Sequence, residues 1–151
     1  MTGFLELLQA SPLASGLRGS FIVYPLVNAA HILAIGALVT CAALMDLRVL
    51  GLGNAVPVKI VLDYLRPVAA VALLIAVTTG ALLFSVRPLE YADNPAFRLK
   101  LILVSAAIAN AVIYNVLPDH TGSGVRKILV ITSLILWLMA AVAGRFIGFV
   151  Q

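Results

Sequence analysis

Long apolar runs separated by short polar segments dominate the chain. The runs are residues 21–45, 67–86, 99–117 and 128–150, and each is almost free of charged residues. A helix that crosses the hydrocarbon core of a bilayer needs about 20 apolar residues, and each run is close to or beyond this length. The pattern therefore predicts four membrane-spanning helices, with both termini on the same side of the membrane because the number of crossings is even.

The segments outside the runs carry helical signals of their own. In residues 57–67 the polar side chains Lys59, Asp63 and Arg66 recur at helical spacing, and apolar residues fill the other faces. This pattern is typical of an amphipathic helix that lies along the membrane surface. Residues 4–10 predict a second short helix, which lies at the membrane interface and leads into the first span.

The other two connections define how the third and fourth helices begin. Asn94 followed by Pro95 is a typical N-cap and first-turn pair, so the third helix is expected to begin before its apolar run. Residues 118–127 form a short, polar, glycine-containing connection. A connection of this kind makes the third and fourth helices antiparallel neighbours.

Composition supports one fold class for the whole chain. Of the 151 residues, 63% are hydrophobic and 11% are charged, with a mean hydropathy of +1.14. A typical soluble domain is about half apolar and about a quarter charged. We expect an all-α, integral membrane four-helix bundle that occupies residues 1–151 as a single domain, with the lipid bilayer as its surroundings.

The excess of basic residues is explained by their position at the membrane surface. The net charge of +4 comes from ten Lys and Arg residues that stand mostly at the ends of the apolar runs, where such side chains anchor a helix against head groups. Nucleic-acid binding is therefore not expected. We call the membrane side of both termini and the second connection the terminal side, and the other the loop side. The ten basic residues divide equally between the two sides, so charge does not orient the protein.

His31 interrupts the first run near its middle and is the main candidate for chemistry. At about 1.5 Å per residue it lies roughly 15 Å from the terminal side. Counted in the same way, Asn110 of the third helix lies about 16 Å deep, and Met139 and residues 78–80 lie near the same level. An ionisable side chain at this depth is costly and normally faces protein. We expect a polar layer inside the bundle, with Asn28, one turn before His31, beside it.

Two roles for His31 follow from this position. A neutral imidazole can hydrogen-bond Asn110 or a threonine and fix the packing of the helices. Alternatively, it can bind haem iron, since histidine in an apolar helical bundle is a common axial ligand of b-type haem. Arg145, about one turn inside the terminal side, is then the candidate partner for a haem propionate; its other role is to extend to the interface.

The second axial ligand has several candidates. Met139 lies at a matching depth, a second subunit can supply its own His31, or the position can stay open. His120 belongs to the connection on the loop side, too far from His31 for a shared iron. As the neighbour of Asp119, His120 is expected to be a solvated loop residue, with a separate metal site as the alternative.

Other motifs exclude several kinds of site and predict close helix packing. Cys41 is the single cysteine, which excludes an intrachain disulfide and a CxxC site. The glycine-containing stretches do not match a dinucleotide or phosphate loop. Gly144 and Gly148 form a GxxxG pair in the fourth helix, which predicts close helix packing and a homo-oligomer.

Three stretches of sequence carry a resemblance to known proteins. They are YPLVNAAHILAIGALV with the following LMDLRVLGLG, then NPAFRLK, and the terminal AGRFIGF. Together these resemble a family of small four-span bacterial inner-membrane proteins of unassigned function. The motif positions that carry over are Asn28, His31, Asp46, Arg48, Asn94, Pro95 and Arg145. The stretch AAHILAIGALV is more distantly similar to histidine-bearing helices of CopD-like and cytochrome b561-like membrane proteins, although this chain lacks their several intramembrane histidines.

We therefore expect a protein of the bacterial inner membrane that binds haem b through His31 and acts in electron transfer or redox sensing with an unknown redox partner. The first alternative is a membrane scaffold or accessory subunit in which His31 is structural. The second is a small transporter or channel, which would need a polar path that reaches both faces. No catalytic motif indicates an enzyme.

Overall fold

The computed structural model describes residues 2–118 and 122–149, and these residues form seven α-helices and no strand. Four of the helices are long and apolar enough to cross a membrane: α3 (Val23–Val49), α4 (Val58–Val86), α6 (Pro95–Val116) and α7 (Ser123–Phe146). They match the four apolar runs. The expected class, an all-α four-helix membrane bundle, is therefore confirmed.

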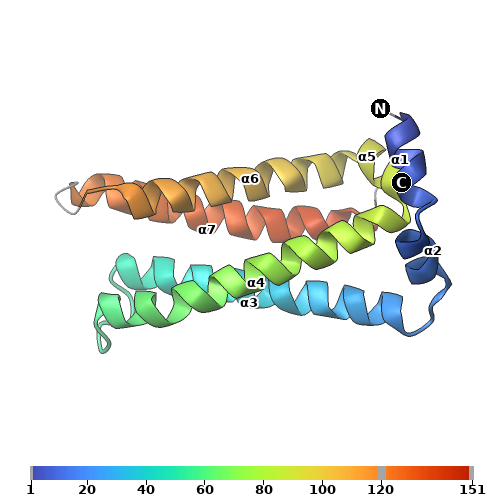
Figure 1. Cartoon of the computed structure of the whole chain (residues 1–151). Helices are drawn as coiled ribbons and strands as arrows, with labels where there is room; N and C mark the ends of the chain where they lie inside the picture. Colours follow the sequence, from blue (N-terminus) through green and yellow to red (C-terminus); the bar gives the residue numbers. More distant parts are fainter. Residues whose placement is uncertain (1, 119–121, 150–151) are drawn as a thin grey trace.

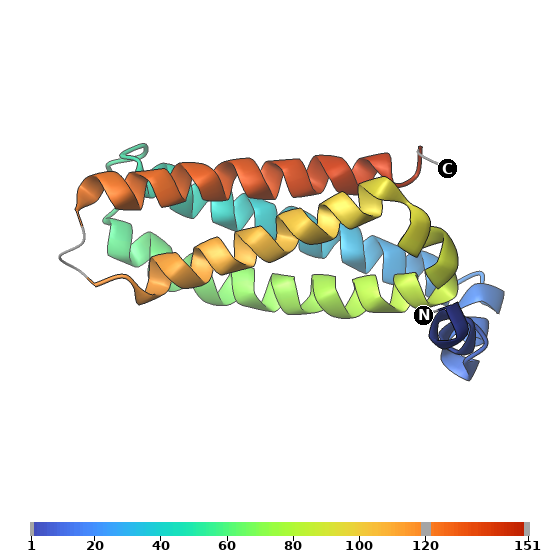
Figure 2. The same cartoon turned by 90° about the horizontal axis from the view of Figure 1, so that it is seen from above.

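The four long helices form two antiparallel hairpins that lie side by side (Figure 1). One hairpin is α3 with α4. The other is α6 with α7, and this pairing was predicted from the short third connection. Among the described residues, α3 and α7 are the only helices from different hairpins whose backbones come close together over their spans. Figure 2 shows the same arrangement from above. The packing of one hairpin on the other therefore depends on a narrow contact.

Trp137 of α7 occupies the centre of this contact. It packs in one cluster with Leu38 and Ala42 of α3, Ala72 of α4 and Ala107 of α6. The Ala107 side chain is 0% exposed and Trp137 is 7% exposed. Small residues let membrane helices approach closely, and here three alanines leave the space that one indole fills. All four spanning helices thus meet around a single large side chain.

Three short helices lie at one end of the bundle, which is the terminal side: α1 (Thr2–Gln9), α2 (Pro12–Gly19) and α5 (Pro88–Asp93) (Figure 1). A helix over residues 4–10 was expected, but α2 was not. The Ser11 hydroxyl accepts a hydrogen bond from the Ala14 amide at 3.2 Å and Pro12 opens the helix, so α2 begins with a standard N-cap. Arg18 of α2 then donates to the Val86 carbonyl at the end of α4.

The second connection contains α5 and the expected start of α6. Asn94 caps α6 by accepting a hydrogen bond from the Phe97 amide at 3.1 Å, as predicted. The helix α5 was not predicted. Tyr91 of α5 packs with Phe84 of α4 and Phe97 of α6, so three aromatic rings hold this short helix between the two hairpins.

The predicted surface helix over residues 57–67 is wrong. In the structure, residues 58–67 are the first turns of the long helix α4 (Figure 1). Pro67 lies inside this helix. An amphipathic repeat fixes which face of a helix is polar but not the direction of its axis, and neighbouring helices can accommodate a proline within a membrane helix. The first turns of α4 therefore extend the span on the loop side, where Lys59 and Asp63 are exposed.

Candidate functional site

His31 bridges the two helices of the first hairpin. Its Nδ1 lies 3.0 Å from Oγ1 of Thr79 in α4. The Thr79 hydroxyl donates its one hydrogen to the Ile75 carbonyl at 2.6 Å, so it must accept from His31. This network assigns the hydrogen of the neutral imidazole to Nδ1. The lone pair of the ring is therefore on Nε2. The ring also interacts with the backbone of Ala76, one turn before Thr79 in α4.

Gly80 provides the space for the His31 ring. A Cβ atom built on Gly80 would lie 3.0 Å from Cε1 of His31. This is closer than almost all real contacts of a Cβ atom, so any larger residue would push the ring or α4 aside. Thr79 and Gly80 are consecutive residues, and they fix the position of the imidazole from two directions.

The second hairpin brings a cation to the same place. Lys100 of α6 lies within electrostatic range of His31, and its side chain packs against Gly144 of α7. A Cβ atom on Gly144 would lie 3.3 Å from the Lys100 Nζ. Within the part of the chain that the structure describes, Lys100 forms no ion pair or hydrogen bond. All four spanning helices therefore contribute to one site, which we call the His31 site: His31, Thr79, Gly80, Lys100 and Gly144.

The sequence pattern had placed Lys100 at the membrane boundary and Gly144 in a GxxxG contact. One signal could have placed Lys100 inside. It lies on the same stripe of α6 as Ala107 and Asn110, and both of these are buried. A lysine on the buried stripe of a membrane helix faces protein rather than lipid.

Asn110, which was expected beside His31, lies elsewhere. It is buried, and its Nδ2 donates to the Leu129 carbonyl of α7 at 3.0 Å. Because α6 begins at Pro95, Asn110 is about 22 Å from the start of the helix, nearer the loop side than counting from the apolar run had suggested. It joins α6 to α7 within the second hairpin.

Three other candidates also lie away from the His31 site. Met139 is 48% exposed, so its thioether does not face the ring. Asn28 is exposed on α3. Arg145 is exposed, and its guanidinium lies 4.9 Å from the centre of the Phe149 ring. His120, the remaining candidate, lies outside the described residues. Of the predicted layer, only Thr79 and Gly80 are brought to the imidazole.

A second polar contact joins α3 to α7 near the loop side. Ser133 of α7 faces the Asp46 carboxyl of α3. The Oδ2 atom of Asp46 is buried and has no hydrogen-bond partner in the described structure. No group of three or more metal-binding side chains is found among the described residues. Among the described residues, the polar side chains of the interior therefore lie at several separate places: the His31 site, the contact of Asp46 with Ser133, and Asn110.

The fold and the site define a class of protein: a multi-pass, all-α membrane protein with a half-buried histidine that joins two of its spans. Comparison of the chain with protein-family models, with curated proteins and with solved structures finds no match. The resemblance to small four-span inner-membrane proteins and to CopD-like proteins therefore stays a prediction.

We expect Gly80→Ala to be less stable than Gly36→Ala by roughly 1–3 kcal/mol, the usual cost of overpacking. Both changes replace a helical glycine, but a Cβ on Gly36 meets nothing within 4 Å. Thermal unfolding in detergent measures the difference. Adding His31→Ala should remove the penalty at position 80, because the clashing ring is gone. Equal stabilities for the two alanine variants would contradict the packing of His31 on Gly80.

Proposed function

We propose that this protein binds haem b in the membrane, with Nε2 of His31 as an axial ligand, and takes part in electron transfer or redox sensing. One observation carries the proposal: the Nδ1 hydrogen is donated to Thr79, which leaves the lone pair of a half-buried imidazole on Nε2. A histidine that ligates a metal usually donates its other ring hydrogen in this way. Bound haem would supply reversible one-electron chemistry.

The residues around His31 fit such a group in part. Thr79 would hold the imidazole in the tautomer that leaves Nε2 free, and Gly80 lets the ring pack against α4. Lys100 shares the site with His31, whereas Arg145 lies over Phe149. We therefore assign Lys100, rather than Arg145, as the partner of a propionate.

A second axial ligand is not supplied by the described residues. Met139 is 48% exposed, and His31 is the only histidine among the described residues. We propose that the position is either open or taken by His31 of a second copy, which agrees with the expected homo-oligomer. The bacterial inner membrane, with both termini on one side, remains the proposed location. Both described ends of the chain lie at the same end of the bundle (Figure 1).

An absorption spectrum of detergent-purified protein, produced with an adequate haem supply, tests the proposal. The oxidised protein should show a Soret band, and reduction with dithionite should give sharp α and β bands. Lys100→Gln should shift the midpoint potential or weaken haem retention, because it removes the cation nearest the ring. Arg145→Gln is the matched control and should change neither. Colourless wild-type protein would overturn the proposal.

One observation favours a second function, that of a membrane scaffold or accessory subunit. The contacts of His31 with Thr79 and Gly80 already join α3 to α4 without any ligand. In that case the imidazole is structural, and the packing of Lys100 against Gly144 joins α6 to α7. The spectrum separates the two functions, because a scaffold has no haem bands.

A further inference from the structure

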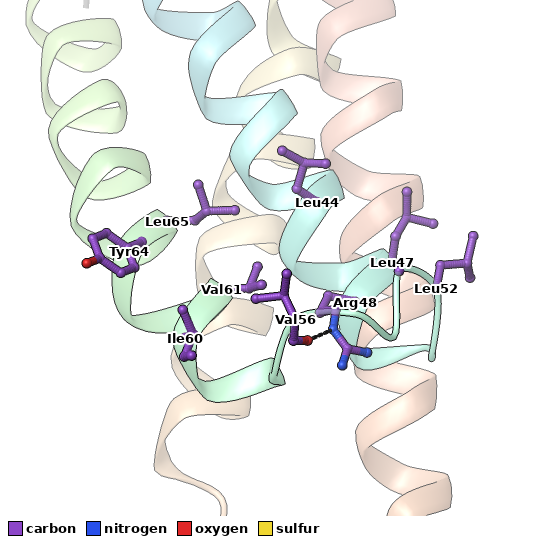
Figure 3. Close-up of a pocket in the computed structure, with 10 residues that line it drawn as sticks. Leu44, Leu47, Arg48, Leu52, Val56, Ile60, Val61, Tyr64 and Leu65 are labelled. Atoms are coloured by element: carbon purple, nitrogen blue, oxygen red, sulfur yellow. Dashed lines mark hydrogen bonds between the residues drawn. The ribbon is translucent and has the colours of Figure 1, made fainter.

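A groove runs between α3 and α4 on the loop side, far from the His31 site along the same helices. It has a volume of about 510 Å³. Figure 3 shows Leu44 and Arg48 of α3 facing Val61 and Leu65 of α4, with Val56 of the connecting loop at the base. Apart from the guanidinium of Arg48, the groove is lined almost entirely by apolar side chains.

A second hollow lies between the same two helices, nearer the middle of the membrane. It has a volume of about 610 Å³ and is lined by Ala34 and Ala37 of α3 and by Val68 and Val71 of α4, among other apolar residues. Ala37 and Arg48 lie on one stripe of α3, about 16 Å apart along the helix. This distance is about half of the roughly 30 Å thickness of the hydrocarbon core. The stretch from Arg48 to Ala37 is therefore as long as one leaflet is deep, and the second hollow extends beyond it to Ala30, about 27 Å from Arg48 along the helix.

Arg48 is the only charged residue that lines either hollow among the described residues. Its Nε donates to the Val56 carbonyl at 2.6 Å, and its Nη1 donates to Oδ1 of Asn54 at 3.1 Å. These bonds hold the guanidinium at the base of the groove (Figure 3). In the described structure, Nη2 has no hydrogen-bond partner, and no carboxylate forms an ion pair with Arg48.

We propose that this groove binds one anionic phospholipid, with its phosphate at Arg48 and an acyl chain along α3 and α4. Guanidinium groups match the geometry of phosphate, and basic side chains at the membrane surface attract anionic lipids. Arg48 stands at the end of the apolar part of α3, which is the level of the lipid phosphates. A second copy of the chain would have to bring a carboxylate to Arg48, whereas lipid phosphates are already at this depth. The site is independent of the proposed haem function.

Native mass spectrometry of the full chain in mild detergent, titrated with phosphatidylglycerol or phosphatidylcholine, tests the proposal. Wild-type protein should bind phosphatidylglycerol roughly fivefold more tightly, as expected for one favourably placed cation at the membrane surface. Arg48→Gln should abolish this preference. Leu65→Trp, which fills the groove but keeps the cation, should weaken binding of both lipids.

Two control variants show whether the lipid preference depends on the charge of Arg48. Lys59→Gln removes an exposed cation from the same end of α4 and should keep the preference. Asn54→Ala removes one loop contact of Arg48 but not the charge, and should also keep it. The proposal is overturned if Lys59→Gln acts as strongly as Arg48→Gln, or if Asn54→Ala does. It is also overturned if Leu65→Trp leaves lipid binding unchanged and instead separates dimers into monomers, because the occupant is then a second copy.

Discussion

Replacement of His31 by alanine is expected to abolish haem binding while the four-helix bundle still inserts into the membrane. Among the described residues, no other histidine or thioether faces the position of the ring, so nothing replaces the lost ligand. The loss should be visible as a missing Soret band and as haem content near zero in a pyridine haemochrome assay. Stability should fall only by about 1 kcal/mol, since the change removes one hydrogen bond to Thr79 and leaves a small void.

Two further variants show whether the loss of haem in His31→Ala is due to the loss of the ligand. Thr79→Val keeps the ligand but removes the acceptor of the Nδ1 hydrogen, so haem should be held roughly 10–100-fold more weakly. Asn28→Ala changes an exposed residue one turn away on the same helix and should leave the spectrum unchanged. A full wild-type spectrum from His31→Ala would exclude His31 as the ligand. If wild-type protein is colourless and Thr79→Val only lowers stability, the scaffold function is favoured.

Trp137→Ala is expected to destabilise the bundle more than any other single truncation, by roughly 3 kcal/mol. The indole fills the space between three alanines and Leu38 where the two hairpins meet. This loss of stability is at the low end for a buried tryptophan. Lipid tails are as apolar as the core of the bundle, so the truncation removes only the packing contacts of the indole. The measurement is the unfolding transition in detergent, followed by circular dichroism.

Leu138→Ala is the matched control for this prediction. Leu138 is the next residue of the same helix and is 53% exposed, so its truncation leaves no cavity and should cost less than about 1 kcal/mol. In Trp137→Ala the helices α6 and α7 should stay paired while the contact of α7 with α3 loosens. Cross-linking between α3 and α7 should then weaken. Equal effects of the two truncations would contradict a central role for Trp137.

Local features of the chain were predictable because their causes are local. Asn94 caps α6 as expected, since the cap depends on a side chain and an amide three residues apart. The helix α2 has the same kind of signal, Ser11 before Pro12, and could have been found in the same way. By contrast, the amphipathic repeat of residues 57–67 indicated a helix correctly but not its direction, because the repeat is the same in a surface helix and in an extension of a span.

Composition and the length of the apolar runs were sufficient to predict an all-α protein with four spans. A bilayer accepts only helices of about 20 apolar residues or closed barrels, so no knowledge of helix packing is needed for this step. The sequence also identified His31, because an imidazole in an apolar run is conspicuous. It did not reveal what surrounds the ring. Counting depth along each helix placed Asn110 and Met139 beside His31, but the structure places them elsewhere.

Which faces of the helices meet became known from the tertiary structure alone. In a bundle within a membrane, apolar residues cover the outside as well as the inside, so hydrophobic periodicity does not identify the buried face. The rotation and stagger of each helix are set by contacts between residues far apart in the chain, such as Lys100 against Gly144 and Trp137 against Ala107. For this reason the His31 site became visible only when the two hairpins were placed side by side.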